Sequence, residues 1–247
     1  MALAPLLPLL RDEPALLKVL GRSSALVAVP DPARAFTIAG LATISARRPL
    51  VVCVPTTADA ERMASDLQTF LGEDVVDVFP AGETLPFERV SPNVETMGQR
   101  LRTLWHLRDP DRAPRVVVAP VRALVQRLGP HVSEIDPIIV GVGDRIDPTE
   151  LVADLVAAGY RREYQVEHRG EVAVRGSIVD VFPSTGSVPV RIDLWGDEVD
   201  RLTEFSVADQ RSTIDVAEGQ IFPARELLPT DEVRERAAAL VAREPWG

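Results

Sequence analysis

The chain has 247 residues, of which 46% are hydrophobic and 26% are charged. This length and composition suit one large or two small globular domains and exclude a disordered or fibrous chain. Acidic residues outnumber basic ones by 37 to 27, and the net charge of −10 argues against a non-specific nucleic-acid binder, which needs a positive face. A single cysteine, Cys53, excludes a disulfide framework and a cysteine-based zinc site and indicates a reducing compartment.

The N-terminal residues 2–10 are apolar, but two prolines interrupt them and charged residues follow directly. These features are typical of a folded start and not of a cleaved secretory leader. No apolar run has the length of a membrane-spanning helix. We therefore expect a soluble, cytoplasmic protein with no membrane partner.

The first half of the chain alternates continuous apolar strands with helices. The pattern predicts strands at residues 24–29, 50–54, 75–79 and 115–119, and helices at 35–45, 57–71, 94–107 and 121–128. Strands that are apolar throughout and separated by helices indicate a parallel sheet covered on both faces. We predict a parallel-sheet α/β domain over residues 1–136.

After about residue 137 the pattern changes to one helix followed by successive strands. The helix begins at Pro148 and is capped by Gly159, and strands are predicted at 160–167, 171–175, 177–182, 188–195 and 198–205. Turn residues separate these strands, which favours an antiparallel meander with one face packed on the helix. We predict a small α+β domain over residues 137–212. Residues 213–247, with a helix at about 231–243, are assigned to the start of a further, truncated domain.

Residues 28–35 follow the first predicted strand, where an α/β nucleotide-binding domain places its phosphate loop. In that loop, glycine amides and a lysine contact the phosphates and a hydroxyl holds magnesium. Here the two glycines, the lysine and the hydroxyl residue are replaced by Ala28, Ala33, Arg34 and Ala35. Two prolines also remove amide donors, and an aspartate adds negative charge. The residues alone leave two interpretations open, an ordinary strand-to-helix turn or a decayed loop, and both predict no nucleotide binding.

The chain has no recognisable catalytic or metal-binding motif. Its three histidines are widely spaced, and none forms a helical pair with a second ligand. No nucleophile-elbow sequence is present. We therefore predict no metal, no cofactor and no catalysis by these residues.

Arginines cluster in the predicted meander. Two strands that should be neighbours would bring Arg161, Arg169 and Arg175 near one exposed surface. Arginine is a frequent anchor of protein interfaces, so this surface is a candidate docking site. The alternative is a solvated sheet face whose arginines form surface salt bridges with acidic neighbours, namely Glu163, Glu167 and Glu171.

Four segments, residues 34–39, 79–92, 160–183 and 191–201, resemble the N-terminal region of the bacterial transcription-repair coupling factor family, Mfd. The similarity extends through essentially the whole chain. In that family this region is itself similar to the excision-repair subunit UvrB, whose intact phosphate loop is followed by Phe-Thr-Ile-Ala, as at residues 36–39 here. The resemblance favours a decayed loop in a degenerate helicase-like domain over an unrelated turn.

The resemblance implies a recruitment function. UvrB carries a DNA-probing hairpin where this chain has the short connection 80–92, so we expect no strong DNA binding, lesion inspection or ATP hydrolysis here. The small domain is expected to bind UvrA after stalled RNA polymerase is displaced, while polymerase binding and the ATP-driven motor belong to domains not encoded here. Alternatively, the same surface clamps onto the C-terminal domain of the full-length protein.

Carried over by motif position, the expected contact residues are Arg161, Arg175 and Phe182. Arg162 and Arg169 are additional candidates that no family motif position supports. Phe182 precedes a proline at a predicted strand end, and the sequence leaves open whether its ring is a core residue or an exposed anchor.

Overall fold

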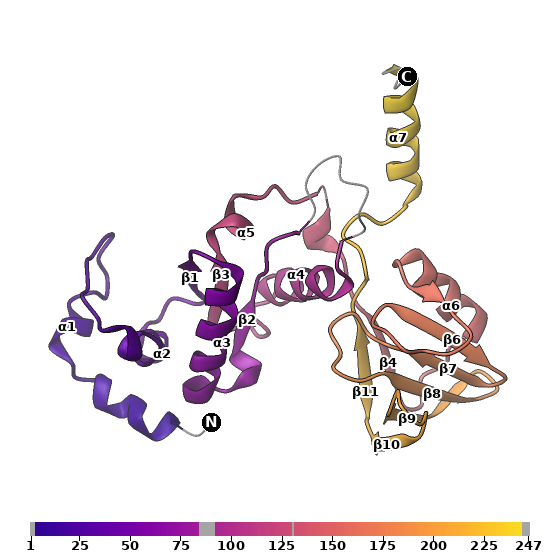
Figure 1. Cartoon of the computed structure of the whole chain (residues 1–247), viewed down its shortest axis with the longest axis horizontal. Coiled ribbons are helices and arrows are strands. Elements are labelled where there is room, and N and C mark those ends of the chain that lie inside the picture. The colour runs from indigo at the N-terminus through magenta and orange to yellow at the C-terminus, as the bar shows by residue number, and fades with distance from the viewer. Residues whose placement is uncertain (1–2, 84–91, 130, 244–247) are drawn as a thin grey trace. The chain divides into compact units, whose positions relative to one another are not determined.

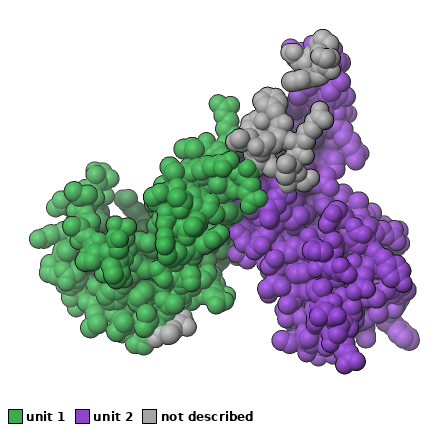
Figure 2. Space-filling model, in the orientation of Figure 1, with its two compact units in different colours: residues 1–83, 103–127 green, residues 84–102, 128–247 purple. Residues whose placement is uncertain are grey.

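The computed structural model describes residues 3–83, 92–129 and 131–243. The chain forms two compact units, one comprising residues 1–83 and 103–127 and the other residues 84–102 and 128–247 (Figure 2). The first contains a three-stranded parallel sheet with helices, and the second a mostly antiparallel six-stranded sheet. The predicted fold class, an α/β unit with a smaller antiparallel α+β unit, is confirmed.

The sheet of the first unit has the strand order β1-β3-β2 (Figure 1). Strand β3 (Val116–Pro120) lies between β1 (Leu50–Val54) and β2 (Val76–Val78), and all of its residues are buried. A central parallel strand with both faces covered must be apolar throughout, which explains its run of valines.

Helix α3 (Thr57–Leu71) packs on this sheet through Ala60, Ala64 and Leu67, which recur at helical spacing. The hydroxyl of Thr56 caps its N-terminus, and Gly72, with a φ of 100°, follows its last residue. The other helices of the unit are short: the 3₁₀ segments Ala4–Leu10, Asp31–Ala33 and Glu73–Val75, and α1 (Pro14–Leu17), α2 (Arg34–Ile44) and α5 (Val121–Val125).

The strand predicted at residues 24–29 is wrong. This segment has no regular secondary structure, and Leu26 is fully exposed. An apolar, β-branched run forms a strand only when a neighbouring strand accepts its backbone hydrogen bonds. In the described part of the first unit, the sheet contains β1, β2 and β3 and offers residues 24–29 no such pairing.

The six-stranded sheet of the second unit has the order β10-β9-β8-β7-β6-β5. Neighbouring strands are antiparallel except β5 and β6, which are parallel, so the predicted all-antiparallel meander is wrong at this edge. Residues 163–170 carry the chain back to the end of the sheet at which β5 begins, so β6 runs in the same direction as β5 and the two strands do not form a hairpin. The strands are β5 (Arg161–Arg162), β6 (Glu171–Arg175), β7 (Ile178–Val181), β8 (Val190–Trp195), β9 (Glu198–Phe205) and β10 (Ser212–Asp215).

Helix α6 (Pro148–Ala157) packs in one core with one face of this sheet. Its N-terminus is capped by Asp147, whose carboxylate accepts hydrogen bonds from the amides of Thr149 and Glu150 at 2.7 and 3.2 Å. These bonds hold the pKa of the Asp147 carboxyl below its ordinary value. The shared core contains Leu151, Val152 and Leu155 of the helix with sheet residues Val172, Val179, Val181, Ile192, Leu194, Val199 and Leu202.

The structure divides the chain at places other than the predicted boundaries at 136 and 213. The pair of strands β4 (Ile138–Gly141) and β11 (Glu218–Ile221) is antiparallel and contributes to the α6 core, so residues 213–221 pack within the second unit. Residues 128–136, including the 3₁₀ turn Val132–Glu134, also belong to it. Helix α7 (Asp231–Arg243) follows and has no buried residue.

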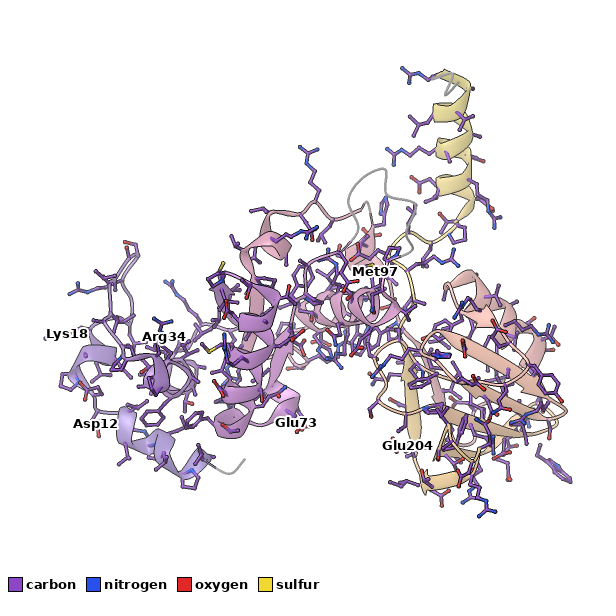
Figure 3. All side chains as sticks on the ribbon, in the orientation of Figure 1. Asp12, Lys18, Arg34, Glu73, Met97 and Glu204 are labelled. Carbon is purple, nitrogen blue, oxygen red and sulfur yellow. The ribbon has the colours of Figure 1, made fainter. Side chains whose placement is uncertain are left out.

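The first part of α4 (Val94–Leu107) also belongs to the second unit. Gly98 lies against Ser184, whose hydroxyl donates to the carbonyl oxygen of Phe222 at 2.7 Å. That carbonyl also accepts from the buried hydroxyl of Tyr160 at 2.8 Å, and burial raises the pKa of Tyr160 to about 12. Met97 (Figure 3), the residue before Gly98, is buried.

None of the helices in the described ranges is long and apolar enough to cross a membrane.

We expect Gly98→Ala to destabilise the protein. An added Cβ would lie 2.3 Å from the Oγ and 2.7 Å from the Cβ of Ser184, so the backbone would have to shift, at a cost of about 1–3 kcal/mol. Thermal unfolding measures the effect. The control is Gly40→Ala in α2, where the atoms nearest to the added Cβ belong to the flexible side chain of Leu10. Gly98→Ala with an unchanged or raised melting temperature would contradict the close packing.

Candidate protein-binding face

Arginines and acidic residues line the face of the six-stranded sheet opposite to α6. Side chains alternate along each strand, and the register places Asp180 between Ala173 and Arg191 of the neighbouring strands. The residues that flank Asp180 in β7, Val179 and Val181, belong to the α6 core. We call this surface the arginine face, and define it by Arg161, Glu171, Arg175, Asp180, Arg191, Asp193, Trp195, Arg201 and Asp215.

Arg175 and Arg191 share one buried carboxylate. The Nε and Nη2 atoms of Arg191 donate to the two oxygens of Asp180 at 2.7 and 2.9 Å, and Nη2 of Arg175 donates to Oδ2 at 2.7 Å. Arg191 also lies over the ring of Phe205 at 4.6 Å. The hydrogen bond to Asp180, together with its charge, outweighs the effect of burial and raises the pKa of Arg191. Both guanidinium groups are therefore held in place by Asp180.

Arg161 is paired with Glu171, its neighbour in the parallel register of β5 and β6. Nη2 of Arg161 donates to Oε1 of Glu171 at 3.1 Å, and Oε2 accepts the amides of Glu167 and His168 at 2.9 and 2.8 Å. Burial alone would raise the pKa of the Glu171 carboxyl, but these amide hydrogen bonds and the nearby His168 and Arg161 lower it instead. Glu171 is thus a structural carboxylate beneath an exposed arginine.

The far end of the face carries Arg201 and Asp193. Arg201 donates through Nε to Asp215 at 2.6 Å, and this hydrogen bond lowers the pKa of the exposed Asp215 carboxyl. Burial raises the pKa of the Asp193 carboxyl, although Arg191 and Arg201 act in the opposite direction. Charge on this face is therefore mixed, because arginines alternate with carboxylates.

The structure brings together two of the five predicted contact residues on one accessible surface. Arg161 and Arg175 lie on the arginine face with 69% and 40% of their side chains exposed. Arg162 lies on the opposite face, because it is the next residue of β5, and lines a cavity with Val152 and Val174. A single step along a strand reverses the side chain, so adjacent arginines cannot share a face.

Phe182 is buried, with 7% of its surface exposed, in a cluster with Val166, Ala173 and Phe205. The sequence left open whether the ring of Phe182 is a core residue or an exposed anchor, and the structure shows that it is a core residue. Arg169 lies 5.5 Å above its ring and donates through Nε to the carbonyl oxygen of Gly186 at 2.7 Å. Phe182 therefore offers no exposed ring, whereas Arg169, which also pairs with Glu95 at 3.4 Å, keeps 35% of its side chain exposed.

Six residues of the face were not predicted from the sequence, namely Asp180, Arg191, Asp193, Trp195, Arg201 and Asp215. Leu194 is buried in the α6 core, so Trp195 stands on the opposite face, where it is 83% exposed. The signal was available, because Arg-Ile-Asp-Leu-Trp at 191–195 alternates polar or aromatic residues with aliphatic ones. An exposed tryptophan on the same sheet face as ordered arginines is typical of a protein-binding surface.

The predicted remnant of a phosphate loop lies in the first unit. Ala28 is exposed in irregular backbone, Ala33 ends the 3₁₀ turn, and Arg34 and Ala35 are the first residues of α2 (Figure 3). The Nη2 atom of Arg34, at the position of the motif lysine, pairs with Asp31 at 2.7 Å. Within the described ranges, no three histidine, cysteine or acidic side chains are grouped closely enough to hold a metal ion.

Comparisons with known proteins place the arginine face inside a matched domain. Residues 138–227 match the family described as the UvrB interaction domain. The chain is 43% identical over 223 residues to the transcription-repair-coupling factor of Mycobacterium bovis, an overlap of 87% of this chain and 18% of the relative. It is 34% identical over 199 residues to the transcription-repair-coupling factor of Escherichia coli, a match that covers 80% of this chain and 17% of the relative. It is 34% identical over 191 residues to the factor of Bacillus subtilis, a match that covers 77% of this chain and 16% of the relative. The chain therefore spans less than a fifth of the length of each of these relatives.

Glu171→Gln is expected to lower stability at neutral pH. Because the folded pKa of Glu171 is lowered, its contribution is present above the ordinary glutamate pKa and is lost as the pH falls through the folded value. The difference in melting temperature between variant and wild type should therefore shrink below about pH 4. Glu167→Gln, the same change at an exposed neighbour, is the control. A difference that stays constant from pH 7 to pH 3 would contradict a charged Glu171.

Calorimetric titration with Mg-ATP is expected to give no saturable heat. The proposed reason is that Arg34 is paired with Asp31, and that prolines replace amide donors in the loop. The double variant Ala28→Gly with Arg34→Lys should not gain binding, since Pro30, Asp31 and Pro32 remain. A micromolar isotherm with the wild-type chain would contradict this expectation.

Proposed function

We propose that this chain, which is homologous to the N-terminal 18% or so of transcription-repair-coupling factors and contains a UvrB interaction domain, recruits the excision-repair protein UvrA. The observation that supports this most directly is the arginine face, a sheet surface within the matched residues that presents ordered arginines and an exposed tryptophan. In this proposal the chain acts in the cytoplasm as a non-catalytic adaptor. Polymerase binding and ATP-driven translocation are assigned to other parts of the full-length protein.

The contacts of the face favour a protein partner. A guanidinium group forms two parallel hydrogen bonds with a carboxylate, which gives direction as well as charge. Arg161 and Arg175 are already held by Glu171 and Asp180, so binding orders them at a reduced entropic cost. Trp195 adds apolar area at the end of β8. The expected partner surface offers carboxylates to the arginines and an apolar recess to the indole ring.

The same pairing argues against DNA as the partner. A phosphate-binding surface presents a stripe of positive charge, whereas on this face the four arginines have acidic partners within hydrogen-bond distance. These pairs are Arg161 with Glu171, Arg175 and Arg191 with Asp180, and Arg201 with Asp215. We therefore assign the face to protein recognition and propose no strong binding to DNA.

A second candidate function uses the same surface within the full-length protein. The exposed parts of Arg161 and Arg175 could be covered by the C-terminal domain, which would make the unit an autoinhibitory clamp. The two functions are compatible, because one surface can serve an internal and an external partner in turn. Under this alternative, the full-length protein would bind UvrA more weakly than the isolated chain does.

Alanine substitution of Arg161, Arg175 or Trp195 is expected to weaken UvrA binding by about tenfold each, and the double arginine variant by more. Arg161→Ala and Trp195→Ala should change the melting temperature little, because these side chains are exposed. Arg175→Ala removes one hydrogen bond from the buried Asp180 and should lower the melting temperature modestly, since Arg191 still pairs with that carboxylate. Titration calorimetry with purified UvrA and thermal unfolding, run on the same samples, measure both quantities.

Two alanine variants at residues that are not part of the defined arginine face serve as controls. Arg162→Ala removes an arginine from the opposite face, and Tyr164→Ala removes an exposed aromatic ring from the β5–β6 connection. Both should bind UvrA like the wild type. An unchanged affinity in the Arg161→Ala/Arg175→Ala variant would exclude this face, and loss of binding together with folding would leave only a structural role.

A further inference from the structure

A buried carboxylate lies beneath the arginine face. Asp180 occupies β7, and only 1% of its side chain is exposed. Its Oδ1 atom accepts one hydrogen bond, from Nε of Arg191, and its Oδ2 atom accepts two, from Nη2 of Arg191 and Nη2 of Arg175. A buried carboxylate is stable only when it is paired, and here two guanidinium groups supply the pairing.

Arg191 is the inner of the two arginines, with 13% of its side chain exposed. It is fixed from three sides: by the bidentate contact with Asp180, by a hydrogen bond from Nη1 to the carbonyl oxygen of Gln210 at 3.1 Å, and by the ring of Phe205. Asp180 and Arg191 therefore form one rigid unit whose position is set by β7, β8 and the segment around residue 210.

Arg175 is the outer arginine and lies at the end of β6, where the chain turns through Gly176. It touches the rigid unit through a single hydrogen bond of 2.7 Å, and its half-exposed guanidinium faces solvent. A free arginine side chain samples many rotamers, and ordering it on binding costs free energy. The bond to Asp180 removes much of that cost before a partner arrives.

We propose that Asp180 is the positioning residue of the docking surface, which fixes the guanidinium of Arg175 so that it meets a carboxylate of the partner in a set orientation. This inference rests on the proposed function, because UvrA is the partner whose affinity it concerns. Asp180 itself is buried and makes no contact with the partner in this account. Its effect on recognition passes through Arg175, and Arg191 holds it in place.

A positioning role and a purely electrostatic role of Asp180 predict opposite effects of Asp180→Asn on the affinity for UvrA. The substitution removes one negative charge, so the face becomes more positive and its attraction to an acidic partner increases at long range. If only charge mattered, UvrA would bind as tightly as before or more tightly. If Asp180 positions Arg175, binding weakens despite the more favourable charge, because the amide holds two guanidinium groups less firmly.

The experiment measures UvrA affinity and melting temperature for wild type, Asp180→Asn, Arg175→Ala and the double variant. We expect Asp180→Asn to weaken binding by about fivefold in the wild-type background and by less than about twofold when Arg175 is already alanine. Asp154→Asn is the matched control: it makes the same change at an exposed carboxylate of α6, outside the arginine face, and should leave the affinity within about twofold of the wild type.

Arg175→Lys keeps the inference testable if Asp180→Asn does not fold. It preserves the charge on a half-exposed side chain, but lysine cannot present a fixed planar group. We expect it to lose nearly as much affinity as Arg175→Ala, and wild-type affinity would overturn the inference. An equal loss from Asp180→Asn with and without Arg175 would overturn it as well. If wild-type protein does not bind UvrA at all, the proposed function fails first, so the two failures are distinguishable.

Discussion

Among the residues that the structure describes, the six-stranded sheet shares a helix-containing core on one of its faces, and this constraint shapes the second unit. The face toward α6 is closed by aliphatic side chains such as Val172, Val179 and Ile192. The other face is closed by a small apolar cluster around Phe182 and by ion pairs that cross neighbouring strands. Because a charged group buried without its partner is strongly destabilising, Asp180 requires the arginines beside it. A charged yet ordered surface is the consequence.

Such a surface differs from an ordinary basic patch. Paired guanidinium groups have a weak long-range field, so they do not attract phosphate chains, but their remaining N–H donors stay in fixed positions. Recognition then depends on short-range geometry, which favours a protein partner with matching carboxylates. The mixed charge of the face and the net charge of −10 of the chain are consistent with this kind of recognition.

Helices and sheet faces could be predicted where local signals were strong. The bounds of α3 follow from the Thr56 cap, apolar residues at helical spacing and Gly72, and the shared face of Arg161 and Arg175 follows from alternation along strands. Pairings between distant segments could not be predicted. Residues 24–29 have a strand composition, but a strand also needs a neighbour, and neither the parallel direction of β5 nor the burial of Phe182 is encoded locally.

The central claim is that the arginine face contacts UvrA, and the exposed ring of Trp195 allows a direct measurement. The chain can be labelled with 5-fluorotryptophan and observed by ¹⁹F NMR as unlabelled UvrA is added, with Trp105, buried in the first unit, as an internal reference. The account predicts that the resonance of Trp195 shifts or broadens well before that of Trp105 changes. Unchanged Trp195 and Trp105 resonances at a UvrA concentration where calorimetry shows a saturated complex would contradict it.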